Sequence, residues 1–161
     1  GQNYEVPEKN KKSESSLYIG NRLIGKYDYF LWQSTGSNSS VIKFDSKNNF
    51  AFVTESPLDS MNYYDRIYLN GEPLPFPETV TNGDKRFSMV SGLMFSGNGK
   101  LFYIGDIKTE PYKTSKEVFI DNRSTGNVYE SAGEISYDPS DDKLTFYASR
   151  EKKLFLVTVK F

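Results

Sequence analysis

The chain contains neither cysteine nor histidine. Without cysteine there can be no disulfide bond, no thiolate nucleophile and no Cys-ligated zinc or iron–sulfur cluster. Without histidine, the Ser-His and Cys-His nucleophile pairs, imidazole metal ligands and the usual general base at neutral pH are excluded as well. Any catalysis would have to use carboxylates, tyrosine, lysine or arginine, and we expect neither a metal ion nor another cofactor.

Long apolar runs and an excess of charge of one sign are also missing. The longest apolar runs, such as 154–157, are far shorter than the roughly 18–20 residues that span a bilayer. The 20 basic and 21 acidic residues nearly cancel, and the sequence has no basic patch. We therefore expect neither nucleic acid nor membrane insertion. With 161 residues, of which 37% are hydrophobic, the chain has the composition of one globular domain with a core.

The first residues are polar and rich in lysine, glutamate and asparagine. We expect 1–15 to be a flexible N-terminal segment and 16–161 to be the folded domain. The segment has the composition that follows a removed export signal, which favours a periplasmic or extracellular location. The absence of cysteine fits a cytoplasmic protein equally well, so that location stays open.

From about Leu17 onward the sequence predicts an all-β chain. Short runs rich in Val, Ile, Tyr and Phe alternate with clusters of Gly, Asn, Asp, Ser and Pro, and no window sustains the apolar spacing of a helix. Asn-Gly pairs at 70–71, 82–83 and 98–99 supply the positive φ of tight hairpin turns. The predicted strands are 17–20, 27–32, 40–44, 50–54, 66–69, 88–95, 101–104, 117–120, 128–131, 134–137, 144–148 and 154–160.

One hairpin pattern occurs three times. In each copy a strand ends in an aromatic residue followed by Asp or Ser, and a polar turn leads into a second strand rich in aromatic residues. The markers Phe44, Phe95 and Tyr137 stand 51 and 42 residues apart, near the period of about 40–50 residues of a four-stranded propeller blade. A third strand follows each hairpin, and a further copy of it, 16–21, precedes the first hairpin. The variable segments after these third strands could hold a fourth strand.

This pattern resembles the TolB-like and WD40-like β-propeller repeats. In that family a strand ends in an aromatic residue and Ser or Asp, a turn such as Pro-Asp-Gly-Lys follows, and an apolar strand comes next. The stretch 95–103, Phe-Ser-Gly-Asn-Gly-Lys-Leu-Phe-Tyr, matches best, 137–146 and 44–52 are looser copies, and none keeps Pro-Asp-Gly intact. The resemblance covers about 16–161. It implies an architecture and no particular function, because the motif residues form the turn and the core.

The number of repeats predicts an incomplete assembly. Propellers typically close with four to eight blades, and this chain holds about three four-stranded ones. We therefore expect a half-propeller that is completed by homodimerisation or belongs to a larger propeller. The alternative is that the repeats close on themselves as a β-sandwich or a barrel.

The aromatic residues, 16% of the chain, supply a candidate ligand-binding site. Aromatic faces stack on sugars and other ligands. Those at repeat positions are expected to form the core between blades. The less periodic ones form the candidate surface: Tyr27, Tyr29, Trp32, Tyr63 and Tyr64.

Acidic residues supply two weaker candidates. The turn with Asp138, Asp141 and Asp142 lacks the spacing of an EF-hand loop, so we expect no metal there. Paired carboxylates could serve a carbohydrate-active hydrolase, and the available ones include Asp28, Asp45, Glu55, Asp65 and Glu134.

No enzymatic motif occurs in the sequence. The sequence therefore favours a non-catalytic binding or protein-interaction module, with a protein or a carbohydrate as its ligand. The paired-carboxylate hydrolase is the alternative.

Overall fold

A computed structural model describes residues 15–27, 29–30, 42–57, 63–81, 86–110 and 113–161. All the regular secondary structure in these residues is β-strand, which confirms the all-β prediction. None of the described residues belongs to a helix that could cross a membrane. The predicted flexible segment 1–15 lies outside the described residues up to residue 14.

The strands form three antiparallel sheets. The first is a hairpin of β1 (Ser15–Ile19) and β2 (Arg22–Tyr27). The last contains β12 (Ser131–Asp138), β13 (Lys143–Arg150) and β14 (Lys153–Lys160). The strands of the nine-stranded sheet between them are β3 (Tyr29–Phe30), β4 (Ile42–Phe44), β5 (Phe50–Pro57), β6 (Tyr63–Leu69), β7 (Glu72–Pro73), β8 (Phe87–Phe95), β9 (Leu101–Glu110), β10 (Lys113–Ile120) and β11 (Arg123–Tyr129).

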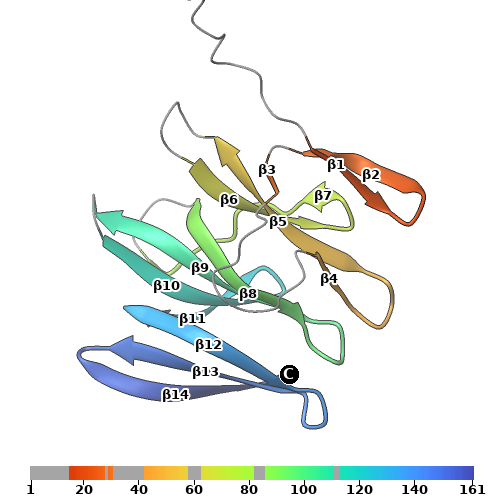
Figure 1. Ribbon diagram of the computed structural model, residues 1–161. Helices are drawn as coiled ribbons and strands as arrows, with labels where there is room; N and C mark the ends of the chain where they lie inside the picture. Colours follow the sequence, from red (N-terminus) through yellow and green to blue (C-terminus); the bar gives the residue numbers. More distant parts are fainter. Residues whose placement is uncertain (1–14, 28, 31–41, 58–62, 82–85, 111–112) are drawn as a thin grey trace, which may run out of the picture.

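The nine-stranded sheet consists of two four-stranded meanders and the short strand β3, which pairs with β5. The first meander, β4–β7, and the second meander, β8–β11, are joined where β6 pairs with β8 through a single residue pair, Asp65 opposite Phe87. The sheets do not close into a barrel, so the barrel alternative is wrong. Figure 1 shows the N-terminal hairpin, the first meander, the second meander and the last sheet following one another, with the hairpin and the last sheet at opposite ends.

The core lies in the three interfaces between these four units. Strand β9 illustrates the principle, because its side chains alternate between the two faces of the sheet and are buried on both. Leu101 and Tyr103 pack toward the first meander, whereas Phe102 and Ile104 pack toward the last sheet. Each unit therefore has a backward face, which covers the preceding unit, and a forward face, which covers the next one.

Turns join the strands at the Asn-Gly pairs 70–71 and 98–99, as the sequence predicts. Asn70 and Gly71 both have positive φ, 55° and 92°, as a two-residue hairpin turn requires. In the pair 98–99 only Gly99 has positive φ, 84°, and the turn between β8 and β9 is longer. The pair 82–83 lies outside the described residues. Glu151 and Lys152 also have positive φ, although neither residue type predicts such a turn.

The fourth strands differ most from the prediction. Of the strand predicted over 27–32, Tyr27 ends β2 and Tyr29 and Phe30 form β3, while residues 28, 31 and 32 lie outside the described residues. Strand β7 has only two residues, since Pro73, Pro75 and Pro77 lack the backbone N–H that a ladder needs. In the second meander the fourth strand, β11, is fully formed.

Candidate functional site

One cross-strand pair occupies an equivalent position on the forward face of the first meander, the second meander and the last sheet, but its exposure differs among the three. In the first meander Val53 lies opposite Ile67, and these side chains are 9% and 3% exposed. In the second meander Ile104 lies opposite Val118, at 0% and 1%. In the last sheet the corresponding cross-strand pair is Tyr147 and Leu156, at 46% and 63%. The same position is therefore core in two repeats and surface in the third.

The next cross-strand pair on the forward face extends the apolar surface in the last sheet, whereas the two meanders have charged residues there. At this position the first meander has Glu55 opposite Asp65, and the second has Asp106 opposite Lys116. The last sheet has Ser149 opposite Leu154, whose side chain is 73% exposed.

The last sheet therefore carries an apolar side chain, Leu154, at the position where the two meanders carry charges. We call the three exposed side chains Tyr147, Leu154 and Leu156 the last-sheet patch.

The surroundings of the patch limit its extent. The same face becomes polar toward its other end, where Thr145 lies opposite Thr158. Among the described residues β14 pairs with β13 alone, so its outer edge carries unpaired backbone groups. An exposed apolar face beside an open strand edge is the usual surface for recognition by another sheet.

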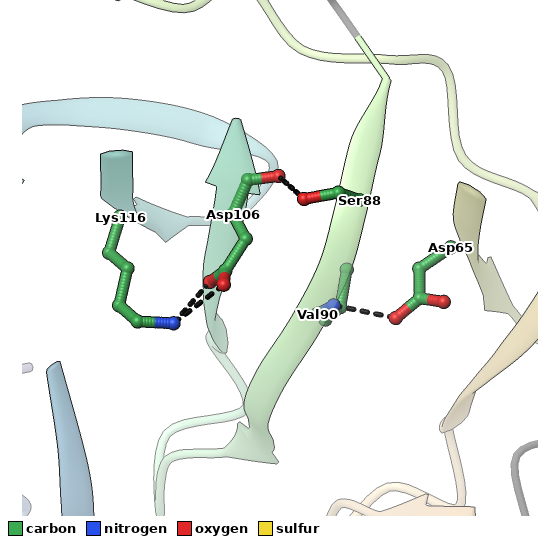
Figure 2. Close-up of polar contacts among 5 residues, drawn as sticks. All are labelled: Asp65, Ser88, Val90, Asp106 and Lys116. Carbon is green, nitrogen blue, oxygen red and sulfur yellow. Dashed lines mark hydrogen bonds and ion pairs between the residues drawn. The ribbon is translucent and has the colours of Figure 1, made fainter. Parts of the chain in front are cut away.

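A cluster of buried charged groups lies where the two meanders meet (Figure 2). Asp65 on β6 is only 3% exposed, and its Oδ2 accepts a hydrogen bond of 2.6 Å from the backbone N–H of Val90 on β8. Burial raises the pKa of the Asp65 carboxyl to about 7, and the nearby charges of Glu55 and Asp106 add to the rise, whereas the Val90 hydrogen bond opposes it. Asp65 is therefore partly protonated near neutral pH.

The second acidic group of the cluster is neutralised by a cation. Lys116 on β10 donates to both carboxylate oxygens of Asp106 on β9, each at 2.6 Å, and both side chains are largely buried. The backbone carbonyl of Asp106 also accepts a hydrogen bond of 3.1 Å from the Ser88 hydroxyl. A buried pair of this kind needs both partners, because the loss of one leaves a desolvated charge.

The carboxylate cluster has the raised pKa of a hydrolytic site but lacks access for a substrate. A carboxyl group with a raised pKa next to other carboxylates is what a general acid requires. Asp65, however, is covered by the junction of β6 and β8. Two open pockets of about 400 and 250 Å³ lie elsewhere, beside Asn48 and Asn70 and beside Leu74 and Asn122, and neither is lined by Asp65.

The predicted aromatic site is dispersed in the structure. Tyr27 ends β2 and is buried, its ring packed edge-on against Phe52 and Tyr68, each at 4.9 Å, and its hydroxyl donating to the backbone carbonyl of Gly71. Burial raises the pKa of the Tyr27 hydroxyl, and the nearby Tyr68 and Glu72 add to the rise. Tyr27 is thus part of the core between the N-terminal hairpin and the first meander.

The other predicted aromatic residues that the structure describes lie at the start of β6 and on β3. Tyr63 is partly exposed, and Tyr64 contacts the ring of Phe76 at 5.7 Å while the Arg86 guanidinium lies over its ring. Tyr29 pairs through its backbone with Glu55 in the sheet. Trp32 lies outside the described residues. A ligand surface at Tyr63 and Tyr64 stays a prediction.

The acidic turn uses its carboxylates for local contacts. Asp142 accepts hydrogen bonds from the Tyr137 hydroxyl and from the backbone N–H of Gly97, which ties the β8–β9 turn to the last sheet. Asp138 accepts from Ser140, and Asp141 pairs with Lys143. Within the described part of the chain, no group of three or more acidic side chains is arranged to hold a metal ion.

Comparison of the chain with protein-family models, curated protein sequences and solved structures gives no match. Function is therefore inferred from the chain itself. The last-sheet patch was not among the site residues predicted from the sequence. The sequence carries no signal for it, because third strands aligned on their aromatic residues place Leu154 with Ile67 and Val118. Its correspondence to Asp65 and Lys116 follows only from the pairing of the strands in the structure.

Proposed function

We propose that the chain is a non-catalytic protein-interaction module built from propeller-like blades, and that the last-sheet patch is its binding surface. The ligand is a further β-sheet whose apolar backward face covers Tyr147, Leu154 and Leu156. The observation that carries this proposal is the exposure of Leu156 at a position where Ile67 and Val118 are buried.

The blade interpretation is supported by the repeat of sheets along the chain. The second meander is a four-stranded antiparallel unit, β8–β11, and the first meander and the last sheet repeat its first three strands. Consecutive units stack through apolar faces, as propeller blades do. The sequence resemblance to TolB-like and WD40-like repeats points the same way.

The choice of a sheet as ligand follows from the interfaces inside the molecule. The forward face of the second meander is covered by Leu144, Phe146 and Ala148, all on the backward face of the last sheet. The patch offers the same kind of forward face, with its strands in the same order. A carbohydrate would instead need polar side chains to orient its hydroxyl groups, and the patch consists of Tyr147 and two leucines.

Site-specific photo-crosslinking tests the proposal. A photoreactive phenylalanine analogue replaces Leu156, and the control carries it at Lys152, in the adjoining turn of the same sheet. We expect adducts from position 156, in extract of the cells that make the protein, that map to apolar residues of a β-strand in a defined polypeptide. A yield at 156 no higher than at 152 would contradict the proposed function.

The paired-carboxylate hydrolase is the second candidate, and the raised pKa of Asp65 beside Glu55 is the observation in its favour. The burial of Asp65 weighs against it, because a substrate would have to reach a group that is 3% exposed. A panel of aryl glycosides assayed with the parent chain and with Asp65→Asn separates the two candidates. Turnover by the parent that disappears in Asp65→Asn would favour the hydrolase.

A further inference from the structure

We propose that the sheet that covers the last-sheet patch belongs to a second copy of this chain, whose N-terminal hairpin β1–β2 docks there head to tail. This inference rests on the proposed function and names its partner. It starts from a second exposed apolar face, on the N-terminal hairpin. Figure 1 shows this hairpin at the opposite end of the molecule from the last sheet.

The outer face of the N-terminal hairpin carries Tyr18 opposite Leu23. These side chains are 56% and 49% exposed, whereas Leu17, on the other face of β1, is buried against the first meander. Nine large hydrophobic side chains are exposed among the described residues, and five of them lie on the outer faces of the two terminal units.

The repeat assigns Tyr18 to a backward face. The stretch 16–21, Ser-Leu-Tyr-Ile-Gly-Asn, is a copy of the third strands at 66–71 and 117–122, so that Tyr18 corresponds to Tyr68 and Phe119. Tyr68 stacks on Phe52 in the core beneath the hairpin, and Phe119 is completely buried in the core between the two meanders. The Tyr18 side chain is instead exposed, and no unit precedes the hairpin among the described residues.

The two exposed faces are therefore of the two types, forward and backward, that pack together inside the molecule. Each of the three interfaces between the described units joins the forward face of one unit to the backward face of the next. One copy presents a free forward face at Tyr147, Leu154 and Leu156 and a free backward face at Tyr18 and Leu23. Docking the last sheet of one copy onto the hairpin of the next continues the internal stacking with the same types of side chain.

The geometry makes the contact heterologous, because the two surfaces are different. Such a contact produces a closed ring if the rotation from copy to copy sums to a full turn, and an open chain of copies if it does not. In either case, one variant with a substituted forward face and another with a substituted backward face still have one unaltered face each. These two unaltered faces can bind each other. This property separates head-to-tail docking from a symmetric dimer.

Sedimentation of the purified full chain over a range of concentrations provides the test. We expect the parent to reach at least twice its mass of 18.4 kDa. The variants Leu156→Ser and Tyr18→Ser should each self-associate at least about tenfold more weakly, since the loss of one central apolar contact costs at least about 1.4 kcal/mol. Val80→Ser removes an aliphatic side chain that is equally exposed but belongs to neither face, and it should associate like the parent.

Mixing decides the direction of docking. Leu156→Ser keeps an intact hairpin face and Tyr18→Ser keeps an intact patch, so an equimolar mixture should form a complex of two chains that grows no further. A parent that stays monomeric, a mixture that stays monomeric, or association that persists in both single variants would each overturn the inference. Circular dichroism of each variant shows whether its fold is retained.

The crosslinking experiment tells the two proposals apart. Adducts from position 156 that map to Tyr18 or Leu23 of a second copy support both. Adducts that map to a sheet of another polypeptide would leave the proposed function standing and overturn the head-to-tail inference. The absence of adducts would contradict the proposed function itself.

Discussion

Replacing Asp65 by asparagine should change how the stability of this protein depends on pH. The pKa of Asp65 is raised in the folded state from 3.8 to about 7, chiefly by burial. The folded chain therefore binds a proton there between pH 4 and 7 that the unfolded chain has already released. The free energy of unfolding falls as the pH rises through this range, because ionising the buried carboxyl is costly.

The magnitude follows from the size of the shift. About three pH units correspond to about 4 kcal/mol, accumulated at about 1.4 kcal/mol per unit. The asparagine side chain would carry no charge at any of these pH values, and its carbonyl can still accept the hydrogen bond from Val90. The stability of Asp65→Asn relative to the parent should therefore increase by about 4 kcal/mol between pH 4 and pH 7 and stay level above that range.

Urea unfolding at half-unit pH steps from 4 to 8 measures this difference. A difference in the free energy of unfolding that is the same at every pH would reflect packing of the amide. The test is therefore how this difference changes with pH. Asp138→Asn serves as a control in an exposed turn, where hydrogen bonds from Ser140 lower the pKa of the carboxyl below the range tested. Parallel curves for the parent and Asp65→Asn would refute the assignment of a buried, proton-binding carboxyl at the junction of the meanders.

Two further substitutions test the packing of the second meander. Gly105→Ala should destabilise the fold by about 1–3 kcal/mol, because the added Cβ would lie 2.4 Å from a ring carbon of the buried Phe87; Gly133→Ala, where nothing lies within 4 Å, is the control in thermal unfolding. Glu117→Gln should cost about 1–3 kcal/mol and increase cleavage of segment 74–81 in limited proteolysis, because the buried carboxylate accepts hydrogen bonds from Val80, Thr81 and Ser124. Unchanged cleavage would show that this segment is held by other contacts.

The hairpins could be predicted from the sequence because they depend on neighbouring residues. Runs rich in Val, Ile, Tyr and Phe specify the strands, and clusters of turn residues between them specify the connections. In the last repeat β13 and β14 lie where such runs place them, although 154–157 is continuously apolar. The turn at Glu151 and Lys152 shows that a strong pair of strands can impose positive φ on residues that do not favour it.

The candidate site could not be predicted in the same way, because burial here depends on contacts between distant segments. Asp65 is indistinguishable in sequence from an exposed strand residue, and its burial arises only when β8 pairs with β6 more than twenty residues later. Tyr27 was expected at a surface since it breaks the aromatic repeat. It is buried because the N-terminal hairpin folds back over Phe52, a placement that no local pattern encodes.

The last sheet differs from the second meander because it has Leu154 at the position where the second meander has Lys116. Lys116 is tolerated at an inner interface because Asp106 accepts its charge, and such a pair adds specificity more readily than stability. Leu154 at the corresponding position has no charge to desolvate when another surface covers it. When nothing covers it, its apolar side chain is exposed to water, which is unfavourable. Leu154→Lys should therefore leave the unfolding free energy of the isolated chain within about 0.5 kcal/mol of the parent, as expected for an exposed position, while it weakens association of the last sheet in sedimentation. A large loss of stability would show instead that Leu154 belongs to the core of a single chain.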